Sequence, residues 1–407
     1  MMQKKKKQNK WLKFRHRIVR NLAYAVLCPY SKWKYGITAE GFREQGDRAY
    51  LILMNHQTPF DQFFVGMSFK GPVYYLATED IFSNGWISSL IRWLVAPIPI
   101  KKQTTDVAAV MNCIRIAKEG GTIAIAPEGN RTYSGKTEFM SPTIASLAKK
   151  LGLPIALYRI EGGYGAQPRW SDVVRKGKMR SYVSRVIEPE AYAQMSNEEL
   201  FAEIEKELFV DEGTPGGTFL SEKRAEYLER AIYVCPYCGL SEFESHGNEI
   251  ECKKCHRKIL YGTDKKLSGV DFSFPFEYVT QWYDYQKEYV CKLDVMQFTK
   301  EPLYRDVANI SEVIVYRKKL LLCKAAEISL YGDRITVNEN QENSMEFPFS
   351  AVSAVAVLGR NKLNIYHDDK VYQLKGGKRF NALKYVNIYF RHKNISRGNE
   401  SGKFLGL

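Results

Sequence analysis

The 407-residue sequence has no apolar segment long enough to span a lipid bilayer as a helix. Such a helix needs about 20 predominantly apolar residues, but residues 22–27 are too few, and residues 86–100 contain charge and proline. The basic amino terminus also lacks the long apolar core of a secretory signal. These absences predict a protein that does not cross a membrane.

Acidic residues are absent from the amino-terminal region, in which Glu40 is the first carboxylate. Eleven basic residues precede it and account for most of the formal net charge of +15. A basic balance alone would also suit a nucleic-acid-binding protein. Its concentration at one end favours a membrane-binding arm, and nucleic acid is an unlikely partner.

Apolar residues are interleaved with these charges: Trp11, Phe14, Ile18 and Leu22 follow helical spacing. This pattern predicts a helix with one apolar and one basic face. Such a helix lies in the headgroup region of an anionic membrane, where each basic residue adds about 1 kcal/mol of attraction. We expect residues 1–35 to hold the protein peripherally on the cytoplasmic face of a membrane. The alternative is a solvated tail.

A histidine and an aspartate follow an apolar run at residues 50–54, in the segment Asn55-His56-Gln57-Thr58-Pro59-Phe60-Asp61. The run is typical of a buried parallel strand, and residues 60–68 have the pattern of a helix. Junctions of this kind carry the chemistry of many α/β folds. His56 suits proton transfer near neutral pH, and Asp61 could accept its other ring N–H. The alternative is a histidine that only caps the helix.

A second motif follows another apolar run, at residues 122–126. It reads Pro127-Glu128-Gly129-Asn130-Arg131. A glycine lets the backbone approach a ligand closely, and an arginine can donate two hydrogen bonds to phosphate oxygens. The segment therefore predicts a phosphate-binding loop, with a surface turn as the alternative.

Together the two motifs resemble those of the 1-acylglycerol-3-phosphate acyltransferase family, Asn-His-x4-Asp and Pro-Glu-Gly-Thr-Arg. Asn130 stands where the family usually has threonine. Residues 95–102 and 153–157 are similar to two weaker family blocks, and the resemblance covers about residues 36–212.

The resemblance implies transfer of an acyl group from acyl-CoA or acyl-carrier protein to the hydroxyl of a lysophospholipid, with phosphatidic acid as the expected product. It makes His56 the general base and Asp61 the group that orients it. It also assigns the acceptor phosphate to Glu128, Gly129, Asn130 and Arg131, with help from Lys101 or Lys102. The sequence has no Gly-x-Ser-x-Gly motif, so direct attack is expected rather than a covalent acyl-enzyme.

Helix and strand patterns alternate across residues 36–212, which predicts an α/β fold with a mainly parallel sheet flanked by helices. Ser196 and Glu199 mark the start of the last helix as a capping box. The expected strands are residues 50–54, 73–77, 122–126, 155–160 and 182–187, and the expected helices are residues 60–68, 84–94, 105–119, 142–151 and 197–210. Residues 86–95 could form a second interfacial patch or belong to the core.

Four cysteines form two Cys-x-x-Cys pairs: Cys235 with Cys238, and Cys252 with Cys255. This arrangement predicts a structural zinc ribbon at residues 233–262 that binds the ion through four thiolates. His246 and His256 are nearby spare ligands. Disulfides are the alternative, and a cytoplasmic location disfavours them.

Short strand patterns recur after about residue 312, at 312–316, 327–331, 334–337, 353–358, 362–366 and 370–374, and a helical segment follows at 381–386. The order loosely resembles a pleckstrin-homology-like barrel. The expected domains are thus an arm (1–35), an acyltransferase domain (36–212), a linker (213–232), a zinc ribbon (233–262), an aromatic connector (263–311), a mainly-β domain (312–394) and a tail (395–407).

Two other functions remain open at this stage. A membrane scaffold could keep this fold without activity, although the presence of His56, Asp61, Glu128 and Arg131 argues against it. A nucleic-acid-binding protein built on the ribbon would leave the two acyltransferase motifs unexplained.

Overall fold

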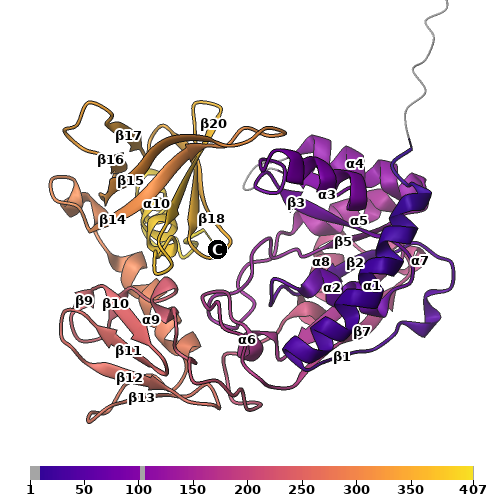
Figure 1. The fold of residues 1–407 in the computed structure, drawn as a ribbon, viewed down its shortest axis with the longest axis horizontal. Helices are drawn as coiled ribbons and strands as arrows, with labels where there is room; N and C mark the ends of the chain where they lie inside the picture. Colours follow the sequence, from indigo (N-terminus) through magenta and orange to yellow (C-terminus); the bar gives the residue numbers. More distant parts are fainter. Residues whose placement is uncertain (1–9, 101–105, 407) are drawn as a thin grey trace, which may run out of the picture.

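The computed structural model describes residues 10–100 and 106–406, which form two lobes (Figure 1). The amino-terminal lobe, residues 10–212, is coloured violet to magenta at the right of the view. The carboxy-terminal lobe, residues 213–406, is coloured pink to yellow at the left. Each lobe contains a seven-stranded sheet, but the two sheets differ in strand direction.

The sheet of the amino-terminal lobe has the order β1-β7-β6-β2-β5-β3-β4. All pairs are parallel except β6 with β7. The predicted strands are confirmed, and the reversed β7 makes the mainly parallel sheet a mixed one. Two three-residue strands, β1 and β4, were not predicted. The bounds are β1 Ile37–Ala39, β2 Leu51–Met54, β3 Val73–Thr78, β4 Ile98–Ile100, β5 Thr122–Ile125, β6 Ile155–Glu161 and β7 Met179–Ile187.

Helices cover both faces of this sheet because successive side chains of its central strands point to opposite sides. Leu51 and Leu53 of β2 belong to one core with α4, α5 and α8. Ile52 and Met54 belong to a second core with α2 and the end of α1. The helices are α1 Phe14–Tyr35, α2 Asp61–Ser68, α3 Trp86–Val95, α4 Val107–Lys118, α5 Thr143–Leu151, α6 Gly163–Ala166, α7 Pro189–Ala193 and α8 Asn197–Leu208, with a short 3-10 turn, η1, at Arg43–Gln45.

The ends of two helices test the sequence predictions directly. The capping box of α8 is confirmed, because the Glu199 N–H donates to Ser196 Oγ at 3.0 Å and the Ser196 N–H donates to Glu199 Oε2 at 2.7 Å. The prediction that Trp11 shares a helix face with Phe14 is wrong, since α1 begins at Phe14. The Trp11 indole instead donates to the Ala96 carbonyl at 3.2 Å.

Residues 234–298 combine a small β unit with a helix. The four-stranded sheet β10-β11-β12-β13 is antiparallel, and β8 pairs separately with β9. The expected aromatic connector contains α9, Val279–Lys292. The other bounds are β8 Val234–Cys235, β9 Gly239–Leu240, β10 Phe243–His246, β11 Glu249–Cys252, β12 Lys258–Tyr261 and β13 Leu267–Gly269, with 3-10 turns η2 Leu228–Arg230 and η3 Val295–Phe298.

The second seven-stranded sheet is antiparallel throughout and curves into a near-barrel beside α10, Leu383–Ser396. The first strand, expected at residues 312–316, is instead β14, which ends at Glu312. The short strand β17 was not predicted. The bounds are β14 Tyr304–Glu312, β15 Leu320–Leu330, β16 Arg334–Val337, β17 Met345–Pro348, β18 Val352–Leu358, β19 Lys362–His367 and β20 Lys370–Gly376.

One continuous hydrophobic core joins the small β unit, α9 and the near-barrel. Trp282 of α9 lies in this core, as do Tyr133 and Trp170 of the amino-terminal lobe. Residues far apart in sequence therefore form one packed carboxy-terminal lobe, and its core extends to the loops of the other lobe.

A second contact between the lobes is polar. The Tyr316 N–H donates to the Phe82 carbonyl at 2.8 Å. Asp80 forms ion pairs with Lys319 and, at 2.9 Å, with Lys362. Burial opposes the charge of Asp80, but the two ammonium groups prevail and lower its pKa to about 2. The near-barrel is therefore fixed against the loop that follows β3.

Candidate active site

His56 and Asp61 meet at the junction between β2 and α2. His56 Nδ1 lies 2.7 Å from Asp61 Oδ2. Asp61 is fully buried and begins α2, where free backbone N–H groups favour a negative charge. It accepts hydrogen bonds from the N–H of Gln57 at 2.7 Å and from the N–H and hydroxyl of Thr58 at 2.9 and 2.7 Å. These bonds hold the carboxylate in one position.

The geometry determines which nitrogen of His56 can act as a base. A carboxylate only accepts hydrogen bonds, so Nδ1 carries the proton and Nε2 keeps its lone pair. Burial lowers the pKa of His56 below its usual value of 6.5; Asp61 opposes this shift, and Arg131 and Arg169 add to it. The imidazole is therefore neutral at pH 7, and 27% of its side chain remains exposed.

Asn55, the residue before His56, connects the end of β2 to β6. Its side-chain amide donates to the Ile160 carbonyl at 2.8 Å, and its Oδ1 accepts from the Ile160 N–H at 2.7 Å. Both groups are buried, so the end of β2 is fixed to the neighbouring strand β6.

The loop after β5 reaches the same place because β5 and β2 are adjacent and parallel. Glu128 Oε1 accepts the backbone N–H of His56 at 2.9 Å. Burial raises the pKa of Glu128 to about 8, although this hydrogen bond acts in the opposite direction. Glu128 thus connects the two motifs. Gly129 has φ = 66°, a left-handed conformation that favours glycine.

Arg131 supplies an unpaired cationic group beside this loop. Its Nη1 is buried and has no hydrogen-bond partner among residues 10–100 and 106–406. Burial lowers the pKa of Arg131 to about 9, and the neighbouring charges of Arg169 and Arg360 contribute to the shift. A buried donor without a partner is costly, so the group is suited to bind an anion.

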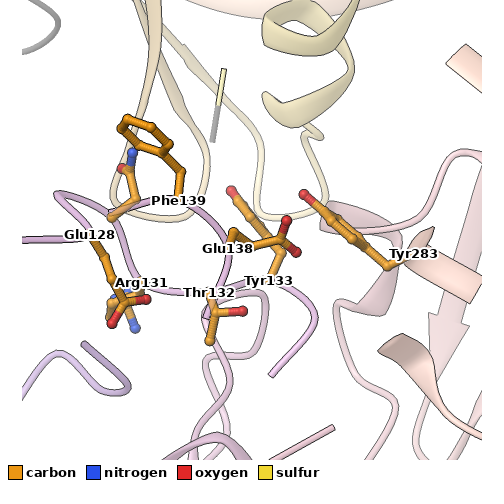
Figure 2. Close-up of a pocket in the computed structure, with 8 residues that line it drawn as sticks. Glu128, Arg131, Thr132, Tyr133, Glu138, Phe139 and Tyr283 are labelled. Carbon is orange, nitrogen blue, oxygen red and sulfur yellow. The ribbon is translucent and has the colours of Figure 1, made fainter. Parts of the chain in front are cut away.

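Arg131 lines a pocket between the lobes, shown in Figure 2. Tyr283, at one side of the view, comes from α9 of the carboxy-terminal lobe. Glu138 lies on the same wall and pairs with Lys287 of α9 at 2.5 Å. The lining residues are Glu128, Asn130, Arg131, Thr132, Tyr133, Glu138, Phe139 and Tyr283.

Arg169 is a site residue that the sequence did not reveal. It is buried, and its guanidinium donates to the Arg131 carbonyl at 2.8 Å and to Asn130 Oδ1 at 3.2 Å. Its charged carbon lies 4.4 Å from the Tyr133 ring centroid. Arg169 follows no motif in the chain, and only the fold brings it to this loop. Lys101 and Lys102, the two other predicted phosphate ligands, lie outside the described residues.

The four predicted zinc ligands are brought together in the carboxy-terminal lobe. The sulfur atoms of Cys235, Cys238, Cys252 and Cys255 all lie within 4.8 Å of one another. The Cys235–Cys255 and Cys238–Cys252 separations are 3.8 and 3.6 Å. Zinc bonds of about 2.3 Å in a tetrahedron place sulfurs roughly 3.8 Å apart. The four thiolates therefore fit a zinc ion.

The two histidines nearby have other partners. His246 pairs with Glu244 at 3.2 Å, and His256 pairs with Glu251 at 2.9 Å.

Comparison with known proteins places this site in context. Residues 37–159 match the family model described as acyltransferase. A 1-acyl-sn-glycerol-3-phosphate acyltransferase of Bacillus subtilis is 23% identical over 164 residues, which cover 40% of this chain and 78% of that protein. The chloroplastic 1-acyl-sn-glycerol-3-phosphate acyltransferase LPAT1 of Arabidopsis thaliana is 24% identical over 184 residues, covering 43% of this chain and 49% of the plant protein.

Among solved structures, the 1-acyl-sn-glycerophosphate acyltransferase PlsC of Thermotoga maritima aligns with a TM-score of 0.38 and 22% identity, covering 47% of this chain and 74% of that chain. The matched family segment contains both motifs, His56 with Asp61 and residues 127–131. Residues 37–159 therefore belong to an acyltransferase domain, and the chain is an enzyme similar to the 1-acylglycerol-3-phosphate acyltransferases.

Proposed function

We propose that this enzyme transfers a fatty acyl group from acyl-CoA or acyl-carrier protein to the hydroxyl of 1-acylglycerol-3-phosphate and produces phosphatidic acid. The observation that carries the proposal is the neutral His56, held by Asp61 on one side, with the unpaired Arg131 on the adjacent loop. A base and an anion-binding group are the two requirements for an acceptor that has a hydroxyl and a phosphate. The relatives named above are acyltransferases of this acceptor.

In the proposed reaction, His56 Nε2 removes the proton of the acceptor hydroxyl as its oxygen attacks the thioester carbonyl. Asp61 stabilises the imidazolium that forms. When the tetrahedral intermediate collapses, the C–S bond breaks, and the imidazolium returns its proton to the thiolate. The acyl group passes directly to the acceptor, and no enzyme nucleophile is needed.

The exposed apolar side chains of α1 and α3 support attachment to a membrane surface. Phe14, Leu22 and Trp33 project from α1, and Trp86 and Trp93 project from α3. A contiguous apolar patch on a soluble surface marks an interaction site. No described helix has the length and apolar content needed to cross a bilayer.

Basic residues lie beside this patch. Arg15 donates to the Trp93 carbonyl at 2.8 Å and lies over the Trp93 ring, while Lys13 and Arg17 are exposed. We propose that this surface rests on anionic lipid and that the enzyme is peripheral on the cytoplasmic face, where its lipid acceptor is available. Residues 86–95, whose place the sequence left open, lie at the surface rather than in the core.

The cysteine cluster supports a structural zinc ion. Cys235, Cys238, Cys252 and Cys255 would occupy all four positions, so the ion would have no open position for a substrate. We propose that it stabilises the small β unit, whose strands are short, and that it takes no part in acyl transfer.

An assay of product formation tests the main proposal. The purified protein is incubated with labelled 1-acylglycerol-3-phosphate and either acyl-CoA or acyl-carrier protein, and the lipids are separated. We expect phosphatidic acid with at least one donor and much less product from glycerol 3-phosphate. An absence of labelled product with both donors would favour the inactive scaffold instead.

A further inference from the structure

The tip of the β18–β19 hairpin brings the carboxy-terminal lobe to the acyltransferase loop. The Val357 carbonyl accepts a hydrogen bond from Arg169 at 3.4 Å, and the same guanidinium donates to Asn130 Oδ1. Arg360 follows on the hairpin tip and forms an ion pair with Asp172 at 2.8 Å. The near-barrel thus brings the Arg360 guanidinium to Asp172, close to Arg169 of the amino-terminal lobe.

Three guanidinium groups lie in this region: Arg131, Arg169, which is bonded to the Arg131 carbonyl, and Arg360, on the hairpin that Arg169 also contacts. The charges of Arg169 and Arg360 both act on Arg131. Arg360 Nε and Arg131 Nη1 are both buried, and each lacks a hydrogen-bond partner within the described part of the chain.

The anions around this cluster do not balance it. Asp172 is shared between Arg360 and Arg230, and Asp61 accepts hydrogen bonds from His56 and Gln57. Glu128, whose pKa is raised to about 8 by burial, is bonded to the backbone of His56. Partly buried like charges repel strongly unless an anion lies between them. A phosphate has the charge and the several acceptor oxygens that these donors require.

We propose that Arg360 of the carboxy-terminal lobe completes, with Arg131 and Arg169, the site for the phosphate of the acceptor lipid. The active site is then composite, and the near-barrel selects phosphorylated acceptors. This inference rests on the proposed function, since it names a further binding residue for the same acceptor.

The test compares Arg360→Gln with the wild-type enzyme. Glutamine keeps a hydrogen-bond donor for Asp172 but removes the charge, and Arg397→Ala, an exposed change on the same lobe, is the control. We expect the KM for 1-acylglycerol-3-phosphate to rise roughly tenfold or more in Arg360→Gln and to stay unchanged in the control. The kcat should change less than the KM, and Arg360→Lys should restore part of the affinity.

A second readout separates this inference from the proposed function. Inorganic phosphate should raise the Tm of the wild-type protein and have a smaller effect on Arg360→Gln. If the wild-type enzyme makes no phosphatidic acid but phosphate binding still depends on Arg360, the proposed acceptor is wrong and the anion site stands. If the enzyme is active and Arg360→Gln changes neither the KM nor the phosphate effect, Arg360 is not part of the site.

A different observation concerns the β14–β15 hairpin, which also contacts the amino-terminal lobe. Leu320, Leu321 and Leu322 are 52%, 45% and 40% exposed. Consecutive strand residues point to opposite faces, so both faces of the hairpin are free of packing here. Val315 and Tyr316 in the turn are also exposed, and Arg317 and Lys318 stand between them and the leucines.

This hairpin adjoins α3, which carries the exposed tryptophans. The Arg92 guanidinium of α3 lies 4.6 Å from the Tyr316 ring centroid. Asn84, just before α3, forms a β-bridge with Lys318. Figure 1 shows the β15 hairpin extending from the near-barrel toward α3. The apolar surface of the amino-terminal lobe therefore continues onto the carboxy-terminal lobe.

We infer that the β14–β15 hairpin inserts its leucines into the same anionic lipid surface that α1 and α3 contact. The basic residues beside the apolar tip carry the charge opposite to that of anionic lipid headgroups and would be attracted to them. The inference extends the proposed membrane attachment and assigns part of it to the near-barrel.

Flotation with vesicles of equimolar phosphatidylcholine and phosphatidylglycerol tests it. The double variant Leu320→Ser with Leu322→Ser should bind roughly tenfold more weakly than the wild type. Met296→Ser, an exposed apolar residue elsewhere on that lobe, should bind normally. If the wild-type protein does not float with the vesicles, the proposed membrane attachment itself is wrong. If the wild type floats and the double variant floats equally well, only the hairpin is excluded.

Discussion

The two lobes use their sheets differently. In the amino-terminal lobe, the carboxyl ends of the parallel strands β2 and β5 meet at one edge, so His56 and the Glu128 loop lie together. In the carboxy-terminal lobe, antiparallel strands alternate in direction, and the ends of two hairpins carry Lys319 and Arg360 to the neighbouring lobe. The parallel sheet therefore brings the residues of the candidate site together, while the antiparallel sheet contacts the other lobe through single hairpins.

The two lobes also differ in the charged groups that they contribute. The side chains of Asp61 and His56 in the first lobe form a pair, and the hydrogen bonds that hold Asp61 come from residues 56–58. The second lobe contributes cations, Lys319 and Lys362 to Asp80 and Arg360 to Asp172. Changes at His56 and Asp61 should therefore alter the chemical step, and changes in the second lobe should alter stability or affinity.

The largest expected effect is that of Asp61→Asn. The amide keeps the size of the carboxylate but can no longer stabilise an imidazolium, so we expect kcat to fall about 10³–10⁴-fold. The control Asp47→Asn changes an exposed aspartate of the same lobe and should have no effect. Steady-state kinetics compares the kcat of the two variants, and a thermal unfolding curve of each checks that it is folded. An Asp61→Asn enzyme of normal kcat would remove Asp61 from the reaction.

Loss of the proposed zinc ion should lower the thermal stability of the carboxy-terminal lobe. Purified wild-type protein is expected to contain stoichiometric zinc by mass spectrometry, and Cys252→Ser should lose the zinc and unfold at a lower temperature. Cys28→Ser, a change on α1, should keep both properties. Zinc-free wild-type protein with an unchanged Tm would exclude a structural metal.

Arg131→Ala should mainly weaken acceptor binding. The loss of a charge-assisted hydrogen bond of about 1.5–3 kcal/mol corresponds to a KM increase of roughly 10–100-fold for 1-acylglycerol-3-phosphate. The KM for the acyl donor should stay constant, and so should both constants in the exposed control Arg43→Ala. An equal rise for donor and acceptor would show that Arg131 supports the site as a whole.

The smallest effect is expected at the membrane surface. Trp33 and Trp86 are 81% and 74% exposed, so changing both to serine should leave Tm unchanged and weaken vesicle binding about tenfold. Phe209→Ser, which is also exposed but lies beyond α8, is the matched control. Unaltered flotation of the double variant would place the lipid contact elsewhere.

The sequence predicted most of the amino-terminal lobe because its strands are short apolar runs and its motifs lie directly after them. Helix positions could also be predicted where the sequence contains a capping residue, as at Ser196. Strands β1 and β4 were missed because three residues give no period. The reversal of β7 depends on its partner β6, and a local pattern contains no information about direction.

Contacts between distant segments explain the remaining differences. Arg169 and Tyr283 reach the pocket from two separate segments, and Arg360 reaches Asp172 from a third; none of them lies in a motif. Trp11 has helical spacing with Phe14, yet its hydrogen bond to Ala96 holds it outside the helix. In each case tertiary contacts, which a single sequence does not display, decided the outcome.

The most direct test of the account is the turnover rate of His56→Ala with saturating 1-acylglycerol-3-phosphate and acyl donor. If His56 Nε2 removes the proton of the acceptor hydroxyl, kcat should fall by about 10²–10⁴-fold while the Tm and the acceptor KM stay close to those of the wild type. A His56→Ala enzyme that still makes phosphatidic acid at the wild-type rate would contradict the proposed base.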